Sequence, residues 1–311
     1  VLCLGRFAVD FYAQQIGARL EDVSSFAKYL GGSSANTAFG CARLGLRTGL
    51  ISRVGDDHLG RFLVETIARE GCDTSHVSVD AARLTGGVVL GIKDRDTFPL
   101  IFLRENCADM AIAEDDVAED YLARSRALLI TGTHFSTRHV DRISHLALER
   151  ARRHGVRTVL DIDYRPVLWG LTKRGDGETR YIRSDTVTAH LQRILPQFDL
   201  VIGNPPYFQL KATAAQKKKF HRVISGRPNV FAFFFQAGIE ALADGGQLAY
   251  VVPPSLNNGA YFESLREYLG EVAAIEHLEV MDASDLFDGA NTAVQLIVLR
   301  KGAAGDRFRF E

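Results

Sequence analysis

Two patterns of apolar and polar residues follow one another along this chain, and the change falls near residue 203. Before it, short apolar runs alternate with longer stretches whose apolar residues recur at helical spacing. Strand–helix alternation of this kind predicts a parallel sheet covered by helices on both faces. The predicted strands are 1–4, 48–54, 127–131, 158–162 and 200–203, the predicted helices are 34–44, 60–70, 138–154 and 184–195, and an antiparallel flap is predicted at 86–93 and 100–104.

After residue 203 the rhythm changes. A long helix rich in Phe is predicted at 230–243, and the turn Asp244-Gly245-Gly246 follows it. The remaining predicted elements are strands at 247–252, 274–280 and 292–299 and a helix at 262–269. The length of 311 residues is enough for one large α/β domain or two smaller ones.

Composition and charge restrict the function classes. Contents of 46% hydrophobic and 24% charged residues are typical of a soluble globular protein, and the net charge of −1 gives no overall attraction to nucleic acid. The four cysteines form no C-x-x-C pair, so we expect neither a zinc site nor a disulfide framework. No apolar run could span a bilayer and no signal peptide opens the chain, which predicts a cytoplasmic protein without a membrane partner. The oligomeric state is left open.

The beginning of the chain is unusual. It starts at Val1, and its only methionines are Met110 and Met281, neither of which suits a fold whose first strand is 1–4. We therefore expect the N-terminus to be trimmed, or the sequence to be assembled from pieces.

A glycine pair marks the first candidate site. Gly31 and Gly32 lie between an extended segment and a helix, where glycine lets the backbone approach a ligand and the helix start offers free amides. An ordinary turn is the alternative. The longer strings 31–45 and 53–60 resemble the N-terminal signature of the PfkB (ribokinase-like) carbohydrate kinases.

Three further strings narrow this resemblance to the 5-dehydro-2-deoxygluconokinases of inositol catabolism, and it covers nearly all of residues 1–203. The strings are 104–109, 131–134 and 161–169. The resemblance implies ATP with magnesium and a small sugar-acid substrate. It also implies that Arg104 lies near the acid end of the substrate and Arg165 near the phosphate path, where guanidinium groups suit anions; structural ion pairs are the alternative. The residues implied to hold sugar hydroxyls are Asp10, Gly31, Gly32 and Asn36.

The phosphoryl-transfer loop of that family has no match here. The resemblance implies a C-terminal Gly-Ala-Gly-Asp loop, whose amides bind the phosphate and whose Asp is the base, and a C-terminal ATP site. Within residues 204–311 the nearest strings are 244–246 and 288–291, and neither matches. Because such transfer depends on positioning and charge stabilisation, loss of the loop should remove most catalysis.

The string Asn204-Pro205-Pro206-Tyr207 points to different chemistry. It follows a predicted strand, and it resembles the target-base loop of DNA adenine methyltransferases. The carbonyls of Asn204 and Pro205 can accept the amino hydrogens of a flipped adenine, the prolines stiffen the loop, and Tyr207 can stack on the base. A proline-rich turn is the alternative.

Downstream strings extend this second resemblance to the restriction-associated adenine-N6 methyltransferases. It spans residues 198–301 and implies S-adenosylmethionine and DNA as ligands. Phe287 is a second candidate aromatic against the base, with core packing equally favoured, and 217–219 is more consistent with a solvated helix face than with phosphate contacts. The Gly-rich methyl-donor turn expected upstream of the loop is replaced by kinase-like sequence, and a DNA target-recognition domain is absent from the sequence.

We therefore interpret the chain as a composite. Residues 1–203 are predicted as the substrate-binding half of a kinase and 204–311 as the C-terminal half of a Rossmann-like methyltransferase sheet, with a seam at 198–203. The hypothesis predicts neither complete phosphorylation nor complete DNA methylation. The alternatives are an ATP-dependent kinase acting on 5-dehydro-2-deoxygluconate with a rewritten C-terminal part, and a methyltransferase or DNA-binding module with an unrelated N-terminal domain. A natural, engineered or artefactual origin is left open.

Overall fold

A computed structural model describes residues 1–94, 97–179, 182–226, 228–281 and 293–302. The chain divides into two compact units, Val1–Ala189 and His190–Glu311. The division lies upstream of the proposed seam at 198–203, which concerns where two sequence patterns meet and stays a prediction.

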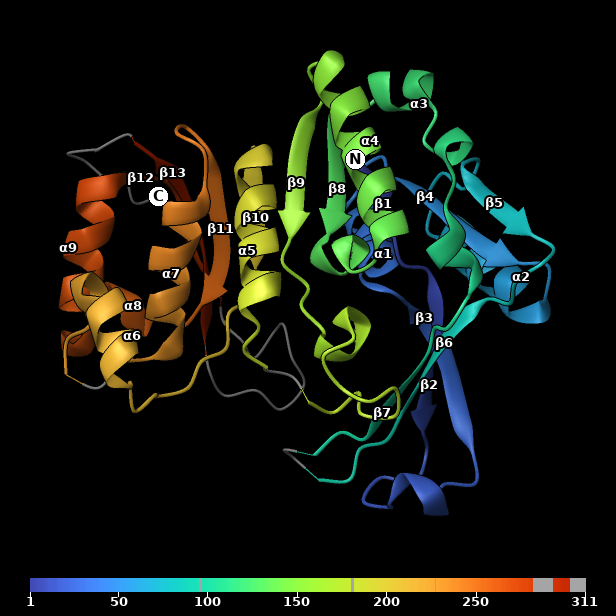
Figure 1. The fold of residues 1–311 in the computed structure, drawn as a ribbon, viewed down its shortest axis with the longest axis horizontal. Helices are drawn as coiled ribbons and strands as arrows, with labels where there is room; N and C mark the ends of the chain where they lie inside the picture. Colours follow the sequence, from blue (N-terminus) through green and yellow to red (C-terminus); the bar gives the residue numbers. More distant parts are fainter. Residues whose placement is uncertain (95–96, 180–181, 227, 282–292, 303–311) are drawn as a thin grey trace. The chain divides into compact units, whose positions relative to one another are not determined.

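The first unit contains a parallel sheet whose strand order is β9-β8-β1-β4-β5 (Figure 1). Its strands consist largely of buried residues; in β8, for example, Leu128, Leu129 and Ile130 are at most 4% exposed. The predicted class, α/β with a mainly parallel sheet covered by helices, is confirmed. The strands are β1 (Leu2–Leu4), β4 (Gly49–Gly55), β5 (Val77–Asp80), β8 (Ala127–Thr131) and β9 (Arg157–Asp161).

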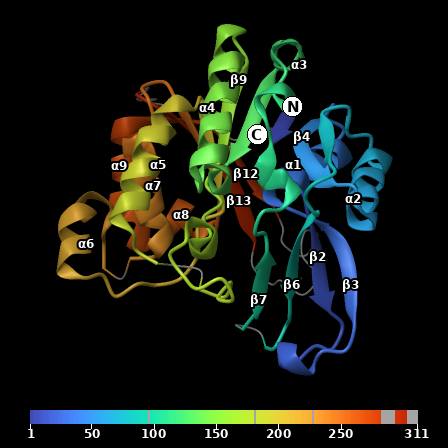
Figure 2. The ribbon, with the colours of Figure 1, turned by 45° about the vertical axis from the view of Figure 1, so that its right-hand side comes forward.

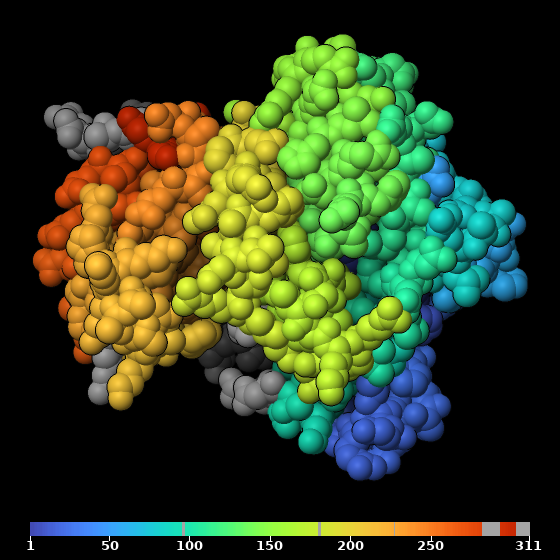
Figure 3. Space-filling model, in the orientation of Figure 1, coloured from blue at the N-terminus to red at the C-terminus, as the bar shows by residue number. Residues whose placement is uncertain are grey.

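Helices pack on this sheet through apolar stripes. In α4 the buried residues include Val140, Ile143, Ala147 and Ala151, which recur three or four positions apart and face β8 and β9. Figure 3 shows α4 and the segment after β9, in green, at the surface of this unit. The helices are α1 (Ser33–Arg43), α2 (His58–Arg69), α3 (Glu119–Ala123), α4 (Arg138–Arg153) and α5 (Asp185–Ile194), which crosses the division between the units.

A second sheet, here called the flap, extends away from the parallel sheet (Figure 2). Its order is β3-β2-β6-β7, with β6 and β7 antiparallel as predicted. The sequence patterns missed β2 and β3, so the flap has four strands among the described residues rather than two. The strands are β2 (Ala8–Ala13), β3 (Phe26–Gly31), β6 (Gly86–Leu90) and β7 (Leu100–Leu103).

The second unit has a mixed sheet of order β12-β13-β11-β10 in its described part. Strands β10 and β11 are parallel, and β13 is antiparallel to both β11 and β12. Phe231 and Phe235 of α7 pack against Phe262 and Tyr250, at ring-centroid distances of 4.9 and 5.2 Å. The elements are β10 (Leu200–Gly203), α6 (Ala214–Lys219), α7 (Val230–Ala241), β11 (Gln247–Val252), α8 (Ser255–Asn258), α9 (Glu263–Val272), β12 (Ala273–Met281) and β13 (Val294–Lys301).

Candidate functional site

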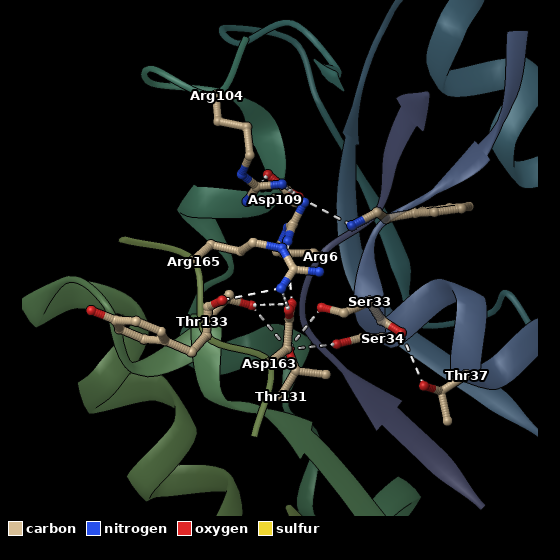
Figure 4. Close-up of polar contacts among 12 residues, drawn as sticks. Arg6, Ser33, Ser34, Thr37, Arg104, Asp109, Thr131, Thr133, Asp163 and Arg165 are labelled. Carbon is tan, nitrogen blue, oxygen red and sulfur yellow. Dashed lines mark hydrogen bonds and ion pairs between the residues drawn. The ribbon is translucent and has the colours of Figure 1, made fainter. Parts of the chain in front are cut away.

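The carboxyl ends of β9, β8 and β1 bring together polar side chains that are far apart in the sequence. Because these strands are neighbours, Arg6 after β1, Thr131 at the end of β8 and Asp163 after β9 lie side by side. Figure 4 shows these side chains gathered at one place. Open α/β sheets bind ligands at the carboxyl ends of their strands, so this edge is the candidate substrate site.

Hydroxyl groups connect helix α1 to this edge. Ser33 Oγ donates to Thr131 Oγ1 over 3.1 Å, and Thr131 Oγ1 is 3.2 Å from Thr133 Oγ1. Thr133 Oγ1 in turn donates to Asp163 Oδ2 over 3.4 Å. The chain of hydrogen bonds therefore fixes Asp163 relative to the first turn of α1 (Figure 4).

Arg104 and Asp109 form a buried bidentate ion pair. Nη1 of Arg104 is 2.6 Å from Asp109 Oδ2, and Nη2 is 3.0 Å from Oδ1. The Cys107 thiol and the Phe7 amide also donate to this carboxylate, over 2.9 and 3.0 Å. Burial opposes ionisation of Asp109, but Arg104 and the two other donors outweigh it and hold the pKa of Asp109 below its usual value. Both amino groups of Arg104 are thus committed to Asp109, and its predicted role at the acid end stays a prediction.

Arg6 is buried but poorly paired. Only 6% of the residue is exposed, and Nη1 contacts Asp163 Oδ2 at 3.4 Å. Its Nε is buried and has no hydrogen-bond partner among the described residues. Burial, followed by the charge of Arg104, lowers the pKa of Arg6 to about 10, against the attraction of Asp163 and Asp109. Arg6 remains a cation at neutral pH and keeps unused hydrogen-bonding capacity.

Arg165 is more accessible. Its Nη1 is 2.9 Å from Asp163 Oδ1, and 34% of its side chain is exposed. Asp161 lies at the end of β9, where burial and the neighbouring charge of Asp163 raise its pKa to about 6, while Arg165 acts in the opposite direction. Arg165 is thus the most exposed of the three arginines, and its predicted place near the phosphate path stays a prediction.

The predicted hydroxyl-binding residues lie where the flap joins α1. The Asp10 carboxyl on β2 covers Gly31, where a Cβ would be 2.2 Å from Oδ1. Gly32 is the N-cap of α1 with φ +94°, and a Cβ there would be 2.4 Å from the Arg6 carbonyl oxygen. Asn36 is exposed in the first turn of α1. Burial raises the pKa of Asp10 and the charge of Arg6 opposes this, so the two side chains interact.

The loop Asn204–Tyr207 follows β10 in the second unit, as predicted. Asn204 and Tyr207 are exposed, whereas Pro205 is buried and Pro206 is half-buried. The Tyr207 hydroxyl contacts Asn204 Oδ1 and also donates to the Val251 carbonyl over 2.7 Å. The Asn204 oxygen that was predicted to accept from an adenine therefore contacts the Tyr207 hydroxyl in this arrangement.

Several residues of the site were missed at the level of sequence. Arg6, Asp109, Asp163 and the Thr131–Thr133 hydroxyls were not singled out as functional, although Arg6 directly follows a strand that ends in glycine and Asp163 lies in a quoted string. Phe287 lies outside the described residues. Within the described part of the chain, no group of three or more His, Cys, Asp or Glu side chains is arranged to hold a metal ion, and no helix could span a membrane.

The parallel sheet with its flap and the polar strand ends define an α/β protein with a candidate ligand site at the edge of its sheet. The model of the pfkB family of carbohydrate kinases matches residues 1–176, more than half of the chain. The chain belongs to the pfkB family of carbohydrate kinases. A second model, described as Eco57I restriction-modification methylase, matches residues 170–287.

Curated relatives agree with this family. The 5-dehydro-2-deoxygluconokinase of Geobacillus kaustophilus is 42% identical over 169 residues, which are 54% of this chain and 50% of that protein. The chain thus spans about half the length of the first relatives it matches. The 5-dehydro-2-deoxygluconokinase of Bacillus anthracis is 30% identical over 267 residues, 85% of this chain and 76% of the relative. A match of that length continues past residue 203.

Solved structures share the fold. A PfkB protein from Polaromonas sp. JS666 has a TM-score of 0.61 and 25% identity, covering 80% of this chain and 75% of that one. An uncharacterised sugar kinase from Pyrococcus horikoshii, solved in complex with ATP, has a TM-score of 0.60 and 19% identity, covering 82% and 71%.

Proposed function

We propose that the first unit binds a sugar acid, 5-dehydro-2-deoxygluconate or a close relative, at the site where the carbohydrate kinases of this family would hold their acceptor. The carrying observation is that Arg6, Arg104 and Arg165 gather near the strand ends (Figure 4), and that the charge of Arg6 acts on the Asp10 carboxyl. Guanidinium groups suit a carboxylate, whereas a carboxylate such as Asp10 and an amide such as Asn36 suit sugar hydroxyls. The names of the curated relatives support the same substrate class.

The test is the preference for acid over neutral sugar. We expect 5-dehydro-2-deoxygluconate to bind measurably in calorimetry and 2-deoxyglucose to bind at least about tenfold more weakly, since a charged hydrogen-bond partner contributes about 1.5–3 kcal/mol. Arg69→Met is the control variant and should leave both affinities unchanged, because Arg69 lies on α2, is 74% exposed and pairs with Glu65 of the same helix. Equal affinities for acid and neutral sugar would contradict the proposal.

We further propose that the chain is a composite that binds the sugar acid without completing its phosphorylation. Support comes from the two family models, which meet at residues 170–176, and from the missing Gly-Ala-Gly-Asp loop. The 267-residue match to a kinase favours the alternative, a kinase with a diverged C-terminal part. Measurement of ADP release in the presence of ATP, magnesium and the sugar acid decides between the composite and the kinase. ADP release that depends on the sugar acid supports the kinase with a diverged C-terminal part.

The loop Asn204–Tyr207 supports a second candidate, binding of an unstacked adenine by the second unit. Its position after β10 and the match of residues 170–287 favour this candidate. The sequence analysis also implied S-adenosylmethionine as a ligand, and nothing in the described residues supports its binding. We expect the fluorescence of a single-stranded oligonucleotide containing 2-aminopurine to be quenched when it binds. Tyr207→Ala should abolish this quenching, whereas the control Tyr261→Ala, a change at another exposed ring, should not. Quenching that survives Tyr207→Ala would exclude the loop.

A further inference from the structure

The three arginines of the candidate site are not equivalent. Arg104 has both amino groups on one fully buried carboxylate, Asp109, which accepts two further hydrogen bonds. Arg165 is held by Asp163 at 2.9 Å. Arg6 shares that same Asp163 at the longer distance of 3.4 Å. The strong partners are therefore taken by Arg104 and Arg165, and Arg6 is left with the weakest pairing of the three.

The position of Arg6 also differs. It follows β1 directly, and its backbone is fixed by close approach of Gly32 at the start of α1. Its charge acts on Asp10 at the flap, on one side, and on Asp163 after β9, on the other. Its guanidinium also lies over the Phe102 ring of β7, 5.4 Å from the centroid. Arg6 thus acts electrostatically on two carboxylates of the candidate site, Asp10 and Asp163.

We propose that Arg6 is the residue that recognises the carboxylate of the sugar acid, and that Arg104 is a positioning residue locked by Asp109. This inference rests on the proposed sugar-acid binding. Nε has no hydrogen-bond partner among the described residues in either Arg6 or Arg104. The amino groups of Arg104 are already bidentate on Asp109, whereas Arg6 has one long ion pair, so Arg6 gains more from an added carboxylate. Figure 4 shows Arg6 between the Arg104–Asp109 pair and the Arg165–Asp163 pair.

The first experiment compares acid and neutral sugar in variants of Arg6. We expect Arg6→Met to weaken binding of 5-dehydro-2-deoxygluconate at least about 30-fold and to leave 2-deoxyglucose unchanged, because loss of one partner of a buried charge pair has effects of this size. Arg6→Lys, which keeps the charge but loses the planar fork, should weaken the acid by about tenfold. If both variants keep the wild-type affinity for the acid, Arg6 does not recognise it.

The second experiment separates Arg6 from Arg104. The double variant Arg104→Met/Asp109→Leu removes both partners of the buried pair, so that no buried charge is left alone. It should keep the preference for acid over neutral sugar, with at most a moderate change in both affinities. Loss of the preference in this variant, with retention in Arg6→Met, would assign the carboxylate to Arg104 and overturn the inference.

The outcomes also distinguish the inference from the proposed function. If the wild-type chain shows no preference for the acid, the proposed function fails, whatever Arg6 does. If the wild type prefers the acid and only the Arg6 assignment fails, the proposed function stands. Inorganic phosphate is the third probe. If phosphate binds the wild type as tightly as the sugar acid does, and Arg6→Met loses this binding, Arg6 holds a phosphate and the carboxylate assignment is overturned.

Discussion

His134 shows how single residues of this site differ from ordinary surface groups. It lies in the 3-10 helix Gly132–Phe135, fully buried, and neither ring nitrogen has a hydrogen-bond partner among the described residues. Burial, aided by the charges of Arg104 and Arg6, lowers its pKa to about 3, although Asp109 acts in the other direction. The His134 side chain is therefore neutral in the folded protein at neutral and mildly acidic pH.

A depressed histidine pKa has a defined effect on stability. The unfolded chain binds a proton below about pH 6.5 that the folded protein does not, so stability is present above that pH and is lost as pH falls toward 3. Between pH 7 and pH 5 the loss from His134 is roughly 2 kcal/mol. Urea unfolding at the two pH values should show this extra loss in the wild type and in the control His58→Gln, an exposed site, but not in His134→Leu. An unchanged loss in His134→Leu would show that another group causes it.

At the scale of elements, helix α1 carries the junction between the flap and the parallel sheet. Its N-cap, Gly32, has a φ of +94° that side chains rarely adopt, and it touches the backbone of Arg6. Its first turn supplies Ser33 to the hydroxyl chain that ends on Asp163. The start of one helix thus orders residues from three strands.

Two glycines of this helix should respond to alanine in opposite ways. Gly32→Ala requires a positive φ and brings Cβ within 2.4 Å of the Arg6 carbonyl oxygen, so we expect a loss of more than about 1 kcal/mol. Gly40→Ala lies inside α1 with no atom within 4 Å of the added Cβ, so we expect a gain of about 0.5–1 kcal/mol. Thermal and urea unfolding measure both. Equal effects of the two changes would refute this account of the N-cap.

At the scale of the whole molecule, two units carry two different candidate sites. The sugar-acid site uses residues from Arg6 to Arg165, all within Val1–Ala189, and the loop Asn204–Tyr207 lies in His190–Glu311. A ligand stabilises the state that binds it, by about 2.7 kcal/mol at one hundred times the Kd. The effect of the sugar acid should therefore be confined to the first unit.

Hydrogen exchange tests this confinement. With 5-dehydro-2-deoxygluconate at saturation, we expect slower amide exchange at the ends of β1, β8 and β9, at the start of α1 and in β2, and unchanged exchange in residues 204–210. A neutral sugar at the same concentration is the control and should slow exchange less, because it is expected to bind more weakly. Equal slowing in the loop Asn204–Tyr207 would show that the second unit takes part in sugar binding.

The sequence by itself determined the class of fold and several members of the site. Apolar runs of strand length identified β1, β4, β8 and β9, because strands buried on both faces leave a continuous apolar signal. A glycine pair before a predicted helix, within strings that resemble the kinase signature, pointed to Gly31 and Gly32. Strands β2 and β3 escaped, because each has a charged residue, Asp10 or Lys28, inside its run, and because the register of β2 depends on partners on two other strands.

The tertiary structure alone decided how the charged residues are paired. The sequence offered Arg104 for the acid end and Arg165 for the phosphate path and did not single out Arg6, since pairing between residues 6, 109 and 163 depends on which strand ends become neighbours. Only the fold shows that Asp109 takes both amino groups of Arg104, and that Arg6 is buried with a single long ion pair. Charge partners are set by distance in space, and residue spacing along a chain does not fix that distance.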